Sequence, residues 1–137
     1  MLIAALPEVG DQWTSLMLLA TVPLAILGTT LLLTARMSTR PDVNIYRSPG
    51  VRTSATLRSR EAWLAAHRAV ARPTLVTAYV LSILSLLNAF VGAFWDVRYA
   101  IAIELAVLLP LPLFGLWVAR TAHKVARELP YPYRADA

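Results

Sequence analysis

The sequence predicts an all-α membrane protein with three transmembrane helices. Of its 137 residues, 58% are hydrophobic and only 15% are charged, whereas soluble domains are about half apolar and about a quarter charged. The apolar residues are concentrated in three blocks. Each block is about 20 residues long or slightly longer, which suffices to cross a hydrocarbon core of roughly 30 Å. The chain length fits one domain, so residues 1–137 are expected to form a single membrane domain.

The three blocks give the expected spans, which run from about 13 to 35, from about 75 to 95 and from about 99 to 119. Only Asp96, Val97 and Arg98 separate the second span from the third, so a tight helical hairpin is expected there. A polar loop, about residues 36–74, joins the first two spans, and residues 120–137 form a polar tail.

The basic residues predict the orientation of these spans. Every Lys and Arg except Arg98 lies in the long loop or the tail, and the segment before Trp13 contains none. The positive-inside rule therefore places the N-terminus outside, and the long loop and the C-terminus in the cytoplasm. Trp13 and Trp95 would lie at the outer interface and Trp117 near the inner one. The basic residues also favour contact with anionic lipid, while no pattern typical of nucleic-acid binding is present.

Small residues recur along the second span at intervals of three or four, at Ala78, Ser82, Ser85, Ala89 and Gly92. This spacing places them on one helical face, which is expected to pack against the other spans because small residues let backbones approach. The bulky residues Leu81, Leu84, Leu87 and Phe94 are expected to face lipid.

Two polar residues lie inside the spans. Pro23, Pro110 and Pro112 cannot donate to the carbonyls of Leu19, Ala106 and Leu108. We expect Asn88 to face the bundle interior and to bond one of these carbonyls, with Ala106 the leading choice. Glu104 is the only acidic residue well inside a span. Either it turns outward or pairs with Arg98, or it contacts an extracellular ligand or a partner helix.

The long loop contains the most distinctive pattern. Pro49 and Gly50 indicate a turn. Ser59 is a good N-cap and Glu61 follows in the first turn, which predicts a short amphipathic helix over residues 60–72. Pro73 either ends or kinks this helix or begins the second span.

The residues of this pattern resemble the signature of the SdpI-like family of small bacterial integral membrane proteins. They are Gly50, Arg52, Thr53, Thr56, Ser59, Trp63 and His67, called the motif residues below. The resemblance implies a multi-pass protein of the bacterial plasma membrane with an immunity and signalling role. It further implies a membrane-active peptide as ligand and a cytoplasmic protein partner at the loop of residues 36–74.

The motif residues also permit structural interpretations. Arg52 and Thr53 could tie the loop to the C-terminal tail or contact phosphate headgroups. Trp63 is expected to be an interfacial anchor rather than a ligand-stacking residue. His67 is expected to pack or hydrogen-bond rather than bind metal, because no second metal ligand lies four residues away on either side.

Two functional hypotheses follow. No nucleophile–base pair, carboxylate pair or phosphate loop is recognisable, and the chain has no cysteine, so no enzyme activity, cofactor or metal is expected. The first hypothesis is an SdpI-like immunity or signal protein that binds an apolar peptide near Asn88 and Glu104. The second is a small accessory subunit of a larger membrane protein complex, in which a partner membrane protein covers the small-residue faces.

Overall fold

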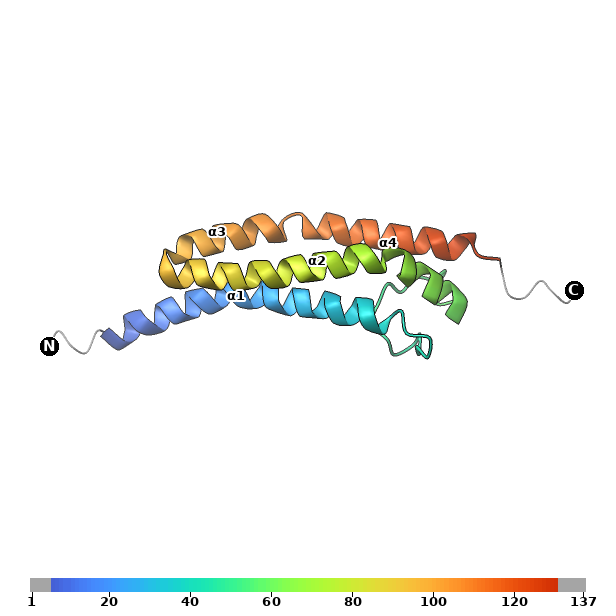
Figure 1. Cartoon of the computed structure of the whole chain (residues 1–137), viewed down its shortest axis with the longest axis horizontal. Helices are drawn as coiled ribbons and strands as arrows, with labels where there is room; N and C mark the ends of the chain where they lie inside the picture. Colours follow the sequence, from blue (N-terminus) through green and yellow to red (C-terminus); the bar gives the residue numbers. More distant parts are fainter. Residues whose placement is uncertain (1–5, 131–137) are drawn as a thin grey trace, which may run out of the picture.

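The computed structural model describes residues 6–130, and every regular element in this part of the chain is an α-helix. The helices are α1 (Leu6–Met37), α2 (Arg60–Phe94), α3 (Val97–Leu108) and α4 (Leu111–Glu128). Figure 1 shows an elongated bundle in which α2 lies between α1 and the row formed by α3 and α4. The predicted all-helical fold is therefore confirmed for the described residues.

Two helical stretches are long and apolar enough to cross a membrane. One is α2, with 35 residues, and the other is the α3–α4 row, with 32 residues from Val97 to Glu128. In α1 the residues from Thr21 to Met37 form a shorter apolar stretch. Large apolar side chains are exposed along all of them, among them Leu86 at 74% and Leu109 at 76%. A surface this apolar is compatible with a membrane protein.

The expected short helix over residues 60–72 is not a separate element, because it is continuous with α2. Ser59 is the N-cap, as predicted, and its side chain accepts a hydrogen bond of 3.0 Å from the Ala62 backbone N–H. Pro73 lies inside the helix rather than at its end. The residues on the packed face continue past the proline and are all buried: Ala66, Val70, Thr74, Ala78 and Leu81. This uninterrupted packing outweighs the one backbone hydrogen bond that Pro73 removes.

The third predicted span is interrupted. Leu109 and Pro110 separate α3 from α4, because Pro110 and Pro112 have no N–H with which to continue the helical ladder. The chain keeps helical dihedral angles at both residues of the break. The Leu109 N–H donates to the Leu105 carbonyl, at 3.0 Å, and the Phe114 N–H donates to the Pro110 carbonyl, at 3.2 Å. The α3–α4 row thus contains a break at which the two prolines cannot donate backbone hydrogen bonds.

The small residues of α2 pack against α1, as predicted. A Cβ added to Gly28 of α1 would lie 2.9 Å from Ser82 Oγ and 3.2 Å from the Ala78 carbonyl oxygen. Ser85 Oγ donates to the Thr21 carbonyl, at 3.0 Å. The expectation that Leu81 faces lipid is wrong, since it is buried. It follows Ala78 by three residues and precedes Ser85 by four, which places it on the packed face.

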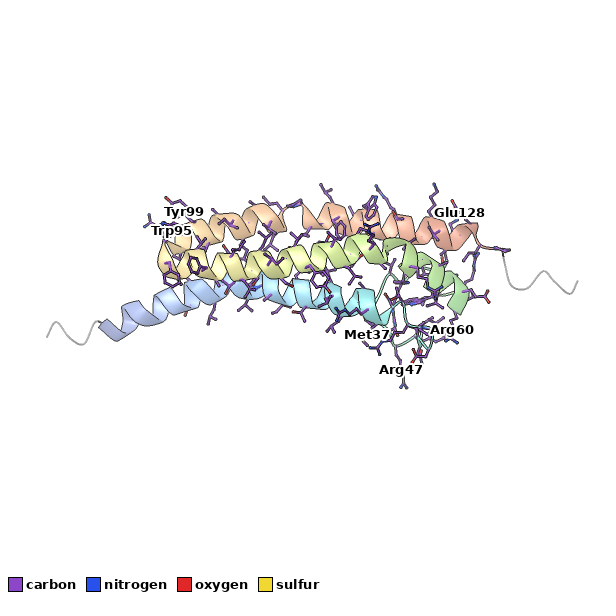
Figure 2. The ribbon with its side chains drawn as sticks, viewed as in Figure 1. Met37, Arg47, Arg60, Trp95, Tyr99 and Glu128 are labelled. Carbon is purple, nitrogen blue, oxygen red and sulfur yellow. The ribbon has the colours of Figure 1, made fainter. Side chains whose placement is uncertain are left out.

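The charged and aromatic residues separate along the long axis. Figure 2 shows Met37, Arg47, Arg60 and Glu128 at one end, and Trp95 and Tyr99 at the other. All described basic residues except Arg98 belong to the first end, called the basic end below. Trp95 and Trp117 are exposed. The Trp13 side chain lies outside the described residues.

Candidate functional site

The motif begins in a turn that only glycine fits well. Gly50 has a φ of +154°, which residues with a Cβ rarely adopt. A Cβ at this position would also overlap Nε2 of His67 and lie 3.0 Å from Cζ2 of Trp63. The next residue, Val51, donates its N–H to Nε2 of His67, at 2.9 Å. The turn is therefore built directly onto the side chains of α2.

The two threonines of the motif close the next turn on each other. The Thr53 N–H donates to Thr56 Oγ1, at 2.9 Å, and the Thr56 N–H donates to Thr53 Oγ1, at 3.2 Å. Thr56 Oγ1 also donates to the Val51 carbonyl, at 2.8 Å. This reciprocal pattern satisfies backbone groups that have no helix or sheet partner. It explains why threonines occupy positions three residues apart.

Trp63 and His67 form the centre of the loop structure. Their rings stack with centroids 4.0 Å apart and an interplanar angle of 26°. Trp63 Nε1 donates to the Ser38 carbonyl at the end of α1, at 3.0 Å. Because Trp63 is 0% exposed, the expectation that it anchors the chain at the membrane interface is wrong. Instead, its indole joins the end of α1 to the start of α2.

The hydrogen bonds of His67 determine its tautomer. Nδ1 lies 2.8 Å from the Trp63 carbonyl oxygen, which can only accept, so Nδ1 carries the proton. Nε2 accepts from the Val51 N–H and is therefore unprotonated. Burial lowers the pKa of His67, and the hydrogen bond to the Trp63 carbonyl opposes this shift only in part. His67 is thus a neutral, hydrogen-bonded residue, as its structural interpretation predicted.

The loop is also tied to α4, as one interpretation of Thr53 predicted. Thr53 Oγ1 lies 3.1 Å from His123 Nδ1. Arg58 donates from one guanidinium nitrogen to the Ala126 carbonyl and to the Leu129 carbonyl, the latter at 2.7 Å. Beneath these contacts, a small apolar core joins the loop, α2 and α4, and its buried members are Ala55, Ala62, Ala66, Val70, Ala122 and Ala126.

Arg52 does not reach α4. Its guanidinium donates to the carbonyls of Ile45 and Ser48, each at 3.4 Å, and its side chain is exposed. The sequence interpretation missed Arg58 and His123. Arg58 of the loop contacts the end of α4, and His123 of α4 contacts Thr53 of the loop. No local signal identifies this pair of contacts, because the contacting groups are about 70 positions apart.

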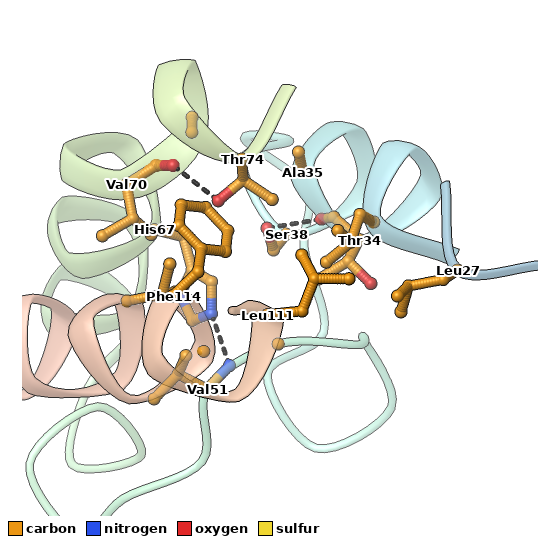
Figure 3. A pocket seen from close by; sticks show the side chains of 15 residues that line it. Leu27, Thr34, Ala35, Ser38, Val51, His67, Val70, Thr74, Leu111 and Phe114 are labelled. Atoms are coloured by element: carbon orange, nitrogen blue, oxygen red, sulfur yellow. Dashed lines mark hydrogen bonds between the residues drawn. The ribbon is translucent and has the colours of Figure 1, made fainter. Parts of the chain in front are cut away.

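A cavity of about 380 Å³ lies beside these residues, between α1, α2 and α4. Figure 3 shows it with the hydrogen bond between His67 and Val51 at its edge. Ser38 and Thr74 bring hydroxyls to it, and both hydroxyls are bonded to carbonyls of their own helices. Its other walls are mainly apolar and include Leu27, Leu31, Leu111, Phe114, Gly115 and Val118. The size and lining suit an apolar ligand.

The two intramembrane polar residues lie away from this cavity. Asn88 and Glu104 are 1% and 5% exposed, and they lie at similar distances from the turn between α2 and α3. Asn88 faces the bundle interior, as expected, while its bond to the Ala106 carbonyl stays a prediction. The outward or Arg98-paired interpretation of Glu104 is wrong. Its side chain is buried, and within the described residues Oε1 has no hydrogen-bond partner.

A model of the SdpI/YfhL protein family matches residues 43–116 of the chain. The match begins in the loop, includes all the motif residues and extends through α2 and α3 into the first turns of α4. No curated protein and no solved structure matches the chain. The matched region covers more than half of the chain, and it contains the loop turn, the stacked Trp63 and His67, and most of the cavity lining.

Proposed function

This chain belongs to the SdpI/YfhL protein family, and on that premise we propose that it is a non-enzymatic membrane immunity and signalling protein. Its ligand is an apolar segment of a membrane-active peptide, and its output is a cytoplasmic protein partner. The family match and the apolar helices support membrane placement. In this placement three spans cross the bilayer, and the basic end lies in the cytoplasm by the positive-inside rule.

One observation carries the proposal. Gly50, Val51 and His67, which organise the loop, also line the apolar cavity. An apolar segment that fills the cavity therefore touches the loop directly. The sequence alone predicts peptide binding near Asn88 and Glu104. The cavity lies at the opposite end of α2, so the binding site is proposed there instead.

The route for the signal follows from the same contacts. The cavity lies between α1 and α4, whose Cα atoms stay more than 8 Å apart throughout the described residues. Occupancy would shift α4 relative to α1, and the break at Leu109 and Pro110 leaves α4 free to move separately from α3. Because α4 holds Thr53 and Arg58, such a shift rearranges the exposed part of the loop. The cytoplasmic protein partner would then bind the rearranged loop.

A cavity-filling variant tests the proposal. Gly115 lines the cavity, and an added Cβ there meets no atom within 4 Å. Gly115→Leu therefore adds an apolar side chain at a cavity-lining position whose Cβ has room, while Gly115→Ala serves as the matched control. A strain deleted for this gene is complemented with each form and grown in its own spent medium, which contains its secreted peptides.

We expect the wild type and Gly115→Ala to restore growth and Gly115→Leu to restore little, at equal protein levels. Equal growth of the deletion strain and all complemented strains would contradict an immunity role. Detergent extraction followed by mass spectrometry provides a second check. Fixed stoichiometry with a larger membrane complex would instead favour the accessory-subunit hypothesis, in which a partner helix occupies the cavity.

A further inference from the structure

A second hollow lies at the basic end, between the loop and α4. It measures about 350 Å³ and is lined by Ser54, Ala55, Arg58, His123 and Arg127. Its polar groups are two guanidinium groups, an imidazole and a hydroxyl, and no carboxylate lines it. Groups of this kind converge where a protein binds an oxyanion, because all of them can donate hydrogen bonds to oxygen.

Two of these polar side chains are held in place by hydrogen bonds to the fold. Arg58 is oriented by the carbonyls of Ala126 and Leu129. His123 is oriented by Thr53 through Nδ1, at 3.1 Å, so its other ring nitrogen points away from this bond. A ligand that meets oriented donors loses less side-chain entropy on binding than one that must order them. Arg127 is exposed at the rim and can close over a ligand.

Next to the hollow on α4, a basic residue is paired with an acidic one. Lys124 lies 4.0 Å from Glu128 in an exposed ion pair one turn apart. Arg127 lies on the adjacent stripe of the same helix and belongs to the hollow. The lining therefore concentrates positive charge, whereas the neighbouring stripe is partly neutralised. This contrast distinguishes the hollow from the general basic character of this end.

We propose that the hollow binds a phosphate group, supplied by the headgroup of an anionic phospholipid. The planar guanidinium fork matches phosphate oxygens. Arg120 is the first charged residue of α4. At the helical rise, His123 and Arg127 follow it by about 5 and 10 Å, which places them in and just beyond a headgroup layer about 5–7 Å thick on each side of the bilayer. A bound phosphate would link the loop to α4 and strengthen the contacts of Thr53 and Arg58.

Arg127→Gln tests this proposal, because Arg127 is exposed and its substitution removes no buried side chain. Lys124→Gln is the matched control, with the same loss of charge on the same turn. The full-length protein in a neutral detergent is mixed with phosphatidylglycerol and phosphatidylcholine, and retained lipid is counted by native mass spectrometry. Inorganic phosphate is titrated in parallel, with thermal unfolding as the readout.

We expect the wild type to retain phosphatidylglycerol in preference to phosphatidylcholine. Arg127→Gln should weaken this retention about tenfold, the loss typical of one charge-assisted hydrogen bond, and Lys124→Gln less than about twofold. Ser54→Ala should weaken it in the same direction. Stabilisation of the wild type, but not of Arg127→Gln, by inorganic phosphate would identify free phosphate as a second source.

Equal losses in the two charge variants would overturn the proposal, since they would indicate diffuse attraction rather than a site. Absence of any preference for phosphatidylglycerol together with no response to phosphate would also overturn it. The inference rests on the proposed membrane placement but not on peptide binding. The lipid and growth experiments can therefore fail independently.

Discussion

Both the backbone conformation at position 50 and the neighbouring side chains favour glycine there. Its φ of +154° suits glycine, and a Cβ would overlap the imidazole that accepts the Val51 N–H. We expect Gly50→Ala to destabilise the protein by about 2–4 kcal/mol, from backbone strain and overpacking together. Unfolding in detergent, followed by circular dichroism, measures this. Gly115→Ala, which meets no atom within 4 Å, should be neutral or stabilising; similar losses in both would refute the steric argument.

His67 makes stability depend on pH. Burial lowers its pKa in the folded state, so the unfolded chain binds more protons at mildly acidic pH. The stabilisation is fully present above the unfolded pKa of about 6.5 and is lost as the pH falls below that value. We expect the free-energy difference between the wild type and His67→Gln to shrink from pH 7.5 to pH 5. A free-energy difference that does not change with pH would contradict this role of His67.

Trp63 shows what a residue pattern leaves open. The sequence predicts that Trp63 belongs to an amphipathic helix, and it lies on the buried face of α2. The sequence did not reveal its role, because a tryptophan at the membrane interface and a buried tryptophan occupy the same positions in a helical pattern. The partner that decides it is the Ser38 carbonyl, 25 positions away. Trp63→Ala is therefore expected to unfold the loop by removing about 3–5 kcal/mol, and it cannot serve as a variant of signalling alone.

At the scale of elements, Arg58 connects the loop to the end of α4. A cationic side chain bonded to the last carbonyls of a helix satisfies acceptors that the helix itself cannot. We expect Arg58→Gln to cost about 1–3 kcal/mol and to speed amide hydrogen exchange in the last turn of α4. Arg60→Gln is the control, because Arg60 is exposed at the N-terminus of α2, where a positive charge is unfavourable. An unchanged rate of amide hydrogen exchange in Arg58→Gln would show that the Arg58 contacts do not stabilise the last turn of α4.

The helices themselves were predicted unevenly. The apolar blocks, the Ser59 cap and the hairpin at Asp96 were predicted because each depends on neighbouring residues. The continuation of α2 through Pro73 and the break at Pro110 were not predicted as such. A proline removes one hydrogen bond in either place. Whether the helix survives depends on packing. The buried residues Val70 and Thr74 lie on either side of Pro73, whereas Leu109 and Pro110 are exposed.

At the scale of the molecule, the charge asymmetry predicts which end faces the cytoplasm. The chain has no cysteine, so single cysteines can be labelled without background. We expect Trp95→Cys to react with a membrane-impermeant maleimide in intact cells, and Tyr46→Cys to react only after the cells are opened. Both positions are exposed, at 76% and 72%. The opposite pattern would reverse the proposed orientation and place the loop outside the cell.

The helical class, the apolar stretches, the one-sided charge and the family could all be predicted from the order of the amino acids. Each of these can be recognised along one dimension, in windows of about 20 residues or in the short spacing of the motif residues. The three-dimensional packing was needed to show that Gly50 and His67 line the cavity, that Arg58 bonds to the end of α4, and that His123 contacts Thr53. These contacts join residues up to 71 positions apart. They form because the packing of α4 on α2 brings the loop and α4 together. Local sequence preferences do not specify contacts between residues so far apart in the sequence.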